Sequence, residues 1–177
     1  MEFGRKIMRV FISYHRADTR YRKKLENILI DKRIEYYAVP EDADFNGKKP
    51  EAIRAFLCAK LKKCDVLICL IGKETYRRPH VDREIHTALK GEPGVRLGII
   101  GVHLPTRRDS LSAVDLNTFP KKLFDNREYV VWADWNDLNE QIKSFAELAR
   151  ERAFDAKIQT AHSHPCLPLK EKIYYDN

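Results

Sequence analysis

Acidic, histidine and hydroxyl side chains gather in four short polar stretches of this chain, and each stretch directly follows a segment with the pattern of a β-strand. The stretches are 13–18 (SYHRAD), 40–47 (PEDADFNG), 72–84 (GKETYRRPHVDRE) and the residues around His103. In an open parallel sheet such loops begin along one edge, where ligands bind. We therefore expect these side chains to meet in one crevice. A carboxylate held there is suited to stabilise positive charge that develops on a bound ligand.

The segments around these stretches alternate between two patterns. Short runs rich in β-branched and aromatic residues predict strands, and apolar residues at helical spacing predict helices. The first helix begins near Asp18, a plausible N-cap, and the second and third begin at prolines, which suit a first helical turn. The predicted strands are 8–13, 34–39, 65–71, 96–104 and 129–132, and the predicted helices are 18–32, 50–61, 79–90 and 138–154. Residues 105–127 show no strong period, so a polar linker that can include short helical turns is predicted there.

Strands that alternate with helices of this length favour βαβ units with right-handed crossovers. We predict a flavodoxin-like, three-layer α/β fold, with a five-stranded parallel sheet in the order 2-1-3-4-5 and helices on both faces. In this order the first and third strands are neighbours and the chain reverses direction between them, so a crevice opens above their C-terminal ends. Residues 1–157 are expected to form this domain, and 158–177 a C-terminal tail.

The composition is that of one globular domain of ordinary size: 177 residues, 44% hydrophobic and 33% charged. The longest apolar run, 66–71, is far below the roughly 20 residues of a membrane span, and the N-terminus lacks the apolar segment of a signal peptide. We expect a cytoplasmic protein without a membrane partner. The formal charge is +7, but the basic residues are spread along the sequence. The charge therefore does not indicate which class of partner the protein binds. Four cysteines without a C-x-x-C pair predict buried, reduced thiols.

Other motifs exclude several classes of site. The chain has neither G-x-G-x-x-G nor a Walker lysine pattern, which argues against a hydride-transfer dinucleotide fold and a phosphate loop. His162, His164 and Cys166 lack an obvious fourth ligand, so no metal site is expected. A response-regulator receiver would need an aspartate at the end of the third strand, where this chain has Gly72.

The ordered segments VFISYHRAD, PEDAD, LIGKETYRRPHVDREI and IIGVHLP together resemble the TIR-like domains of the Thoeris anti-phage defence protein ThsB, relatives of the Toll/interleukin-1 receptor domains. The resemblance covers residues 9–135. It implies a TIR-like fold that uses NAD as a substrate and releases nicotinamide. The second product would be a cyclic or conjugated ADP-ribose signal that activates an effector protein.

The resemblance also implies partners and site residues. Self-association and a phage-protein trigger are expected, whereas a resident cofactor and nucleic acid are not. Glu84 lies where such domains place their catalytic glutamate. Pro40 and His80 depart from the family pattern, which has tryptophan and an aromatic residue at these positions. The residues that the resemblance assigns to NAD binding lie in the polar stretches that follow predicted strands: Ser13, His15, Asp18, Glu41, Asp42, His80 and His103. Phe45 and Tyr76 lie in the same stretches and are added to the site because their rings could stack on a base.

One well-placed carboxylate is sufficient for this chemistry. Breaking the bond between ribose and nicotinamide generates an oxocarbenium-like centre, as in glycoside hydrolysis, but nicotinamide leaves as a neutral molecule and needs no proton. Glu84 is expected to hold the ribose hydroxyls and stabilise the positive charge. It follows Val81 by three residues and precedes Ala88 by four, so it borders the apolar stripe of its helix and can be partly buried.

A structural role remains open for each of these residues. Glu84 could be a surface carboxylate paired with Arg77 or Lys90, and Asp18 a simple N-cap. The remaining candidates could be loop residues without contact to a ligand: His15, Glu41, Asp42, Phe45, Tyr76 and His103. Correspondingly, the alternative function is a non-catalytic TIR-like module for interaction and assembly.

Overall fold

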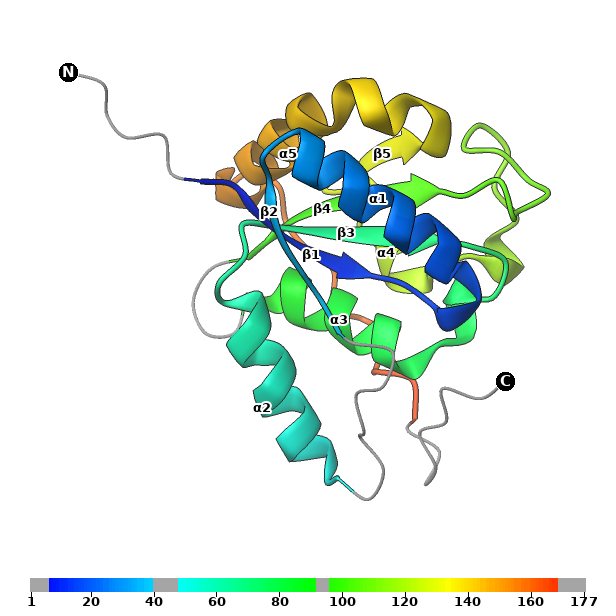
Figure 1. The fold of residues 1–177 in the computed structure, drawn as a ribbon. Helices are drawn as coiled ribbons and strands as arrows, with labels where there is room; N and C mark the ends of the chain where they lie inside the picture. The colour runs from blue at the N-terminus through cyan, green and yellow to red at the C-terminus, as the bar shows by residue number, and fades with distance from the viewer. Residues whose placement is uncertain (1–6, 40–47, 92–95, 169–177) are drawn as a thin grey trace.

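A computed structural model describes residues 7–39, 48–91 and 96–168, and these form a parallel sheet with helices on both faces (Figure 1). The strand order is β2-β1-β3-β4-β5, as predicted. The strands are β1 (Arg9–Ser13), β2 (Glu35–Ala38), β3 (Val66–Ile71), β4 (Gly98–His103) and β5 (Val131–Asp134). The helices are α1 (Thr19–Asp31), α2 (Pro50–Leu61), α3 (Pro79–Lys90), α4 (Lys121–Asp125) and α5 (Leu138–Phe154), with 3-10 turns at Arg16–Asp18, Thr75–Arg77, Leu116–Thr118 and Trp135–Asp137.

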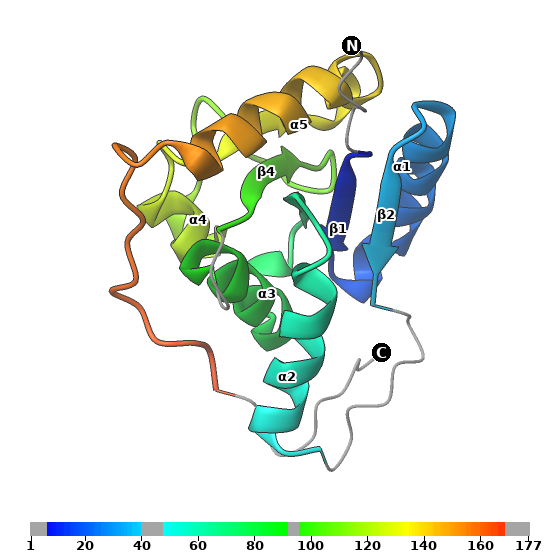
Figure 2. The same ribbon diagram turned by 90° about the vertical axis from the view of Figure 1, so that its left-hand side faces the viewer.

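The sheet separates two apolar clusters. Helices α1 and α5 cover one face, and α2, α3 and α4 cover the other (Figures 1 and 2). Leu25 of α1 and Ile142 of α5 belong to the first cluster, and Leu57 of α2 and Ile85 of α3 to the second. All residues of β3 and β4 are buried, because both faces of a central parallel strand are covered. The predicted three-layer α/β fold is therefore confirmed.

Helix α3, which carries Glu84, has well-defined ends. Pro79 occupies its first turn, where a missing N–H costs nothing. Gly91 ends the helix with a left-handed backbone (φ 70°), and its N–H donates to the carbonyl of Thr87. Both ends agree with the prediction, because proline and glycine impose local geometry whatever surrounds them.

One predicted segment differs from the structure. Strand β5 begins at Val131, two residues later than predicted. Tyr129 and Val130 are buried, but their backbone N–H groups donate to Asn126 O in a turn. These two residues are apolar because they are buried, although they do not pair with a neighbouring strand. The linker 105–127 contains the short helix α4, in agreement with the short helical turns that the prediction allowed there.

The segment after α5 crosses the outer side of α4 and α3 (Figure 2). Residues 158–168 form neither helix nor strand, but they make repeated polar contacts with this face, and we call them the strap. Asn126 exchanges two hydrogen bonds with the backbone of Ala161, at 2.7 and 3.1 Å. Lys122 Nζ donates to Pro165 O at 2.9 Å, and Leu167 N donates to Asp82 Oδ2 at 2.9 Å. The described part of the predicted tail is therefore attached to the domain.

Two further predictions concern cysteines and membranes. All four cysteines are free, but only Cys69 is fully buried, while Cys58, Cys64 and Cys166 are half-buried. The prediction of buried thiols is thus too broad: Cys58 lies on α2, whereas Cys64 and Cys166 lie outside the helices and strands. In the described parts of the chain, no helix combines the length and apolar character needed to cross a membrane.

Candidate functional site

Glu84 lies inside the protein, at the C-terminal edge of the sheet. Its side chain extends from α3 toward the end of β1, and the residue is 3% exposed. Ser13, the last residue of β1, donates from Oγ to Glu84 Oε2 at 2.5 Å. Because the carboxyl group is buried and bound to Ser13, the alternative of a surface carboxylate paired with Arg77 or Lys90 is wrong.

The surroundings of Glu84 favour its neutral form. Burial raises the pKa of Glu84 to about 8, and the hydrogen bond from Ser13 opposes this effect by stabilising the carboxylate. Ser13 faces Cys69 of β3 in the register of the sheet. The pKa of the Cys69 thiol is raised first by burial and then by the charge of Glu84. A carboxyl group in this environment changes charge readily near neutral pH, as catalytic acids and bases often do.

A small cavity lies next to the carboxyl group. It is lined by Glu84, Ile12, Tyr14, Val39 and His80, and its volume of about 10 Å³ is the space that one water molecule needs. The cavity lies between α3 and the ends of β1 and β2. The crevice was predicted above the first and third strands, but none of the lining residues of this cavity belongs to β3.

Three residues assigned to NAD binding lie outside the described residues. Glu41, Asp42 and Phe45 belong to 40–47, the segment that follows Val39. Pro40, one of the two departures from the family pattern, lies in the same segment. Their assignment stays a prediction.

Two histidines lie close to the Glu84 cavity. His80 Nε2 is 3.1 Å from Tyr14 O, in the range of a hydrogen bond. His15 is buried, and its Nδ1 has no hydrogen-bond partner among the described residues. Burial, assisted by the charge of Arg78, lowers the pKa of both imidazoles to about 4. Both histidines are therefore neutral at pH 7, and each can donate or accept a hydrogen bond.

Asp18 is a second buried acid at this edge. It is 3% exposed, and burial raises its pKa to about 6. Its Oδ1 is 3.5 Å from Thr106 Oγ1, whereas its Oδ2 has no partner in the described part of the chain. A Cβ on Gly72 would lie 2.5 Å from Asp18 Cγ, so glycine is needed there. Although Asp18 precedes α1, its side chain makes no capping hydrogen bond, so the N-cap alternative does not explain its burial.

His103 belongs to a different cluster from Glu84. Its Nε2 is 3.0 Å from Asp109 Oδ1, and its Nδ1 is 3.9 Å from Asp134 Oδ1. Arg107 forms a bidentate ion pair with Asp109: its Nε donates to Oδ1 at 2.7 Å, and its Nη2 donates to Oδ2. This pair holds the pKa of Asp109 well below its ordinary value. His103 therefore helps to hold the loop after β4, and it does not line the Glu84 cavity.

The sequence interpretation missed Arg107, Asp109 and Thr75. Thr75 Oγ1 accepts from Gly72 N at 2.9 Å and donates to Leu70 O at 3.2 Å, which shapes the loop after β3. Arg107 and Asp109 were placed in the polar linker 105–127. The only available signal was the pair of opposite charges two residues apart, directly after a predicted strand.

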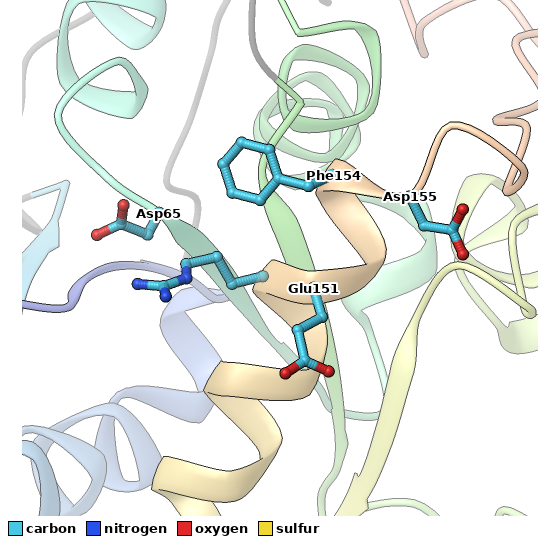
Figure 3. A pocket seen from close by; sticks show the side chains of 5 residues that line it. Asp65, Glu151, Phe154 and Asp155 are labelled. Carbon is cyan, nitrogen blue, oxygen red and sulfur yellow. The ribbon is translucent and has the colours of Figure 1, made fainter.

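A cavity of about 590 Å³ lies at the opposite edge of the sheet, where β3 begins and α5 ends (Figure 3). Asp65, Arg150, Glu151, Phe154 and Asp155 line it, and none of them was assigned to the site. Phe154 and Asp155 point to opposite sides of the helix end (Figure 3). Across the described residues, no group of three histidine, cysteine or acidic side chains is arranged to hold a metal ion.

Comparisons with known proteins place these observations in a family. The family model described as "Thoeris protein ThsB, TIR-like domain" matches residues 11–109, which are 99 of the 177 residues. This range includes the end of β1 and all of β3 and α3, and therefore both Ser13 and Glu84. No curated protein matches the chain.

One similar solved structure is that of the TIR domains in the activated Roq1 resistosome, which directly recognises the pathogen effector XopQ. It is 17% identical, has a TM-score of 0.43, and the match covers 84% of this chain and 85% of that one. The assignment therefore depends on the family model, which covers more than half of the chain. On that basis, the chain belongs to the family of TIR-like domains of the Thoeris anti-phage defence protein ThsB.

Proposed function

We propose that the protein cleaves NAD, releasing nicotinamide and producing a cyclic or conjugated ADP-ribose signal for an effector protein. The observation that supports this function best is the position of Glu84, which is buried next to the end of β1 and bound by Ser13 at 2.5 Å. A buried carboxylate stabilises positive charge more strongly than one in water, because the local dielectric constant is lower.

In this proposal Glu84 acts on the ribose of NAD. As the bond from the ribose C1′ to the nicotinamide nitrogen breaks, its electron pair leaves with nicotinamide and positive charge develops on the ribose. The Glu84 carboxylate stabilises this charge and accepts hydrogen bonds from the ribose hydroxyls. A hydroxyl group then attacks C1′ and forms the new bond to the ribose, and its proton passes to solvent water. This hydroxyl belongs to the same ADP-ribose in a cyclic product and to a second molecule in a conjugated product.

Binding of NAD would itself favour the charged form of Glu84. The pKa of about 8 applies to the protein without substrate. A positively charged pyridinium ring beside the carboxyl group favours the carboxylate, because an opposite charge within a few ångströms lowers the pKa of an acid. The proposed enzyme would thus become active as the substrate enters.

The test is mass spectrometry of small molecules from phage-infected cells that express the wild type or Glu84→Gln. Nicotinamide and an ADP-ribose derivative are expected to increase only with the wild type. Purified protein incubated with NAD, with and without a lysate of infected cells, provides the matching assay in vitro. Wild-type protein that releases no nicotinamide in either setting would refute the proposal.

One observation favours the alternative of a non-catalytic assembly module. The cavity that the described residues form beside Glu84 has about 10 Å³, which is too small for a nicotinamide ring. A protein without turnover needs no larger cavity. Phage protection by cells carrying Glu84→Gln decides between the two functions: full protection favours the module, and lost protection favours the enzyme.

Ser13→Ala is expected to shift the pH profile of nicotinamide release upward by about one pH unit. The Ser13 hydroxyl stabilises the Glu84 carboxylate and thereby lowers its pKa, so its removal raises that pKa further. If the carboxylate is the active form, the rate at pH 7 falls about tenfold and recovers at higher pH. Ser13→Thr keeps the hydroxyl and is expected to keep the profile. An unshifted profile in Ser13→Ala would show that this hydrogen bond does not tune Glu84.

A further inference from the structure

A second cavity opens beside the candidate site, between the loops that follow β3 and β4. Its volume is about 430 Å³, within the usual range for small-molecule pockets. The loop after β3 contributes Lys73, Glu74 and Tyr76, and the loop after β4 contributes residues 106–109. Residues 115 and 118 complete the wall. The family resemblance assigned no role to most of these residues.

The acidic side chains of this cavity are already bound by the protein itself. Asp109 accepts from Arg107 through both oxygens, and Asp115 N donates to its Oδ2 at 2.8 Å. Asp115 in turn accepts from Thr118 Oγ1 at 3.1 Å. Because these carboxylates are neutralised or hydrogen-bonded internally, they offer little attraction to a cationic ligand.

Glu74 and Arg107 are also engaged. Glu74 forms ion pairs with Arg77 and Arg78. Besides Asp109, the Arg107 guanidinium donates to Thr118 O at 2.6 Å, to Thr118 Oγ1 at 3.2 Å and to Gly72 O at 3.5 Å. Arg107 is 8% exposed. It therefore forms a rigid wall that connects the two loops, and its donors are not available to a ligand.

Two cationic side chains of the cavity are available to a ligand. Lys73 and Arg108 are exposed, and neither forms an ion pair or hydrogen bond with the rest of the described chain. They come from the two different loops, so a ligand between them would meet a positive charge from each. Because the acids are engaged and these cations are not, the cavity favours an anion. Arginine and lysine are the usual protein partners of phosphate groups.

The cavity also offers an aromatic surface. Tyr76 is half-buried and lines it, and an aromatic ring can stack on a nucleobase. Thr106, on the opposite loop, lies within 3.5 Å of the buried carboxyl group of Asp18. Through Thr106 the cavity therefore borders the polar edge at which Asp18 lies beside β1.

From this charge distribution we propose that the cavity is a binding site for a nucleoside diphosphate. Lys73 and Arg108 bind the two phosphate groups, and Tyr76 stacks on the base. That this ligand is the ADP portion of the substrate rests on the proposed function. Binding itself does not depend on turnover, so the two can be tested separately.

The test is calorimetric titration of the full-length protein with ADP. Lys73→Ala/Arg108→Ala is expected to weaken ADP binding at least about tenfold, because two charge-assisted contacts are lost. The matched control is Lys24→Ala/Lys143→Ala, which removes the same charge from exposed positions on α1 and α5 and should change the affinity less than about twofold. Higher salt is expected to weaken binding to the wild type more than to the pocket variant.

Other outcomes separate the site from the enzyme. No ADP binding by the wild type, unchanged affinity in the pocket variant, or equal loss in the control would each overturn the site. Glu84→Gln is expected to bind ADP like the wild type. If ADP binding depends on Lys73 and Arg108 but no nicotinamide is released, the site stands and the proposed enzyme does not. If ADP binding depends on Lys73 and Arg108 and nicotinamide is also released, Lys73→Ala/Arg108→Ala should raise KM for NAD and leave kcat unchanged.

Discussion

Glu84→Gln is expected to abolish nicotinamide release and, in the same protein, to increase stability at alkaline pH. Glutamine has the shape of glutamate but never carries its charge. Loss of the carboxylate should lower the rate by roughly 10² to 10³ or more, as is typical when a group that stabilises transition-state charge is removed. A residue kept for function at the expense of stability would behave in this way.

The change in stability follows from proton binding. The pKa of Glu84 is about 8 in the folded protein, where burial raises it, against an ordinary value of 4.5. Between these values the folded state holds a proton that the unfolded state has released, so wild-type stability falls as the pH rises. Each pH unit corresponds to about 1.4 kcal/mol. The loss of wild-type stability that Glu84 causes is therefore roughly 5 kcal/mol at most, and it is complete above pH 8.

Urea unfolding at pH 5 and pH 9 measures this effect. Glu84→Gln and the wild type should differ little at pH 5, and the variant should be several kcal/mol more stable at pH 9. Glu147→Gln, at an exposed position on α5, is the control and should leave the pH dependence unchanged. Equal pH dependence in the wild type and Glu84→Gln would contradict the buried, proton-binding state of Glu84.

Lys122→Met is expected to destabilise the fold by roughly 3 to 5 kcal/mol, since it leaves a largely buried carboxylate without its cation. The Lys122 and Asp82 side chains are only 6% and 15% exposed. Lys122 Nζ donates to both oxygens of Asp82, at 2.7 and 2.8 Å, and to Pro165 O of the strap. Asp82 precedes Glu84 by two residues on α3. The same ion pair thus connects the strap to the helix that carries the candidate catalytic residue.

The neighbouring lysine provides the control for this prediction. Lys121 is exposed on α4, so Lys121→Met should change the free energy of unfolding by less than about 0.5 kcal/mol. Asp82→Asn/Lys122→Met removes both charges and should cost less than Lys122→Met alone. Chemical denaturation of the wild type and of these three variants measures the free energies of unfolding. Similar values for Lys121→Met and Lys122→Met would show that the buried ion pair contributes nothing.

The success of the fold prediction came from residues that act locally. The unbroken apolar run 66–71 required a strand covered on both faces, and Pro79 and Gly91 defined the ends of α3. Alternating elements and right-handed crossovers indicated a parallel sheet, and the strand order was that of the flavodoxin-like arrangement expected for it. Strand β5 was misplaced by two residues because Tyr129 and Val130 are buried in a turn, and burial alone does not distinguish a turn from a strand.

The sequence by itself determined the layers, the order of the strands and the edge at which the polar loops meet. It also indicated Glu84, through its place beside an apolar stripe and the family resemblance. Only the tertiary structure decided that Ser13 binds this carboxyl group, that His103 belongs to a cluster with Asp109, and that the strap is joined to α3. The reason is physical: helix and strand patterns depend on neighbours a few residues apart, whereas these contacts join groups whose positions are set by the packing of the whole domain.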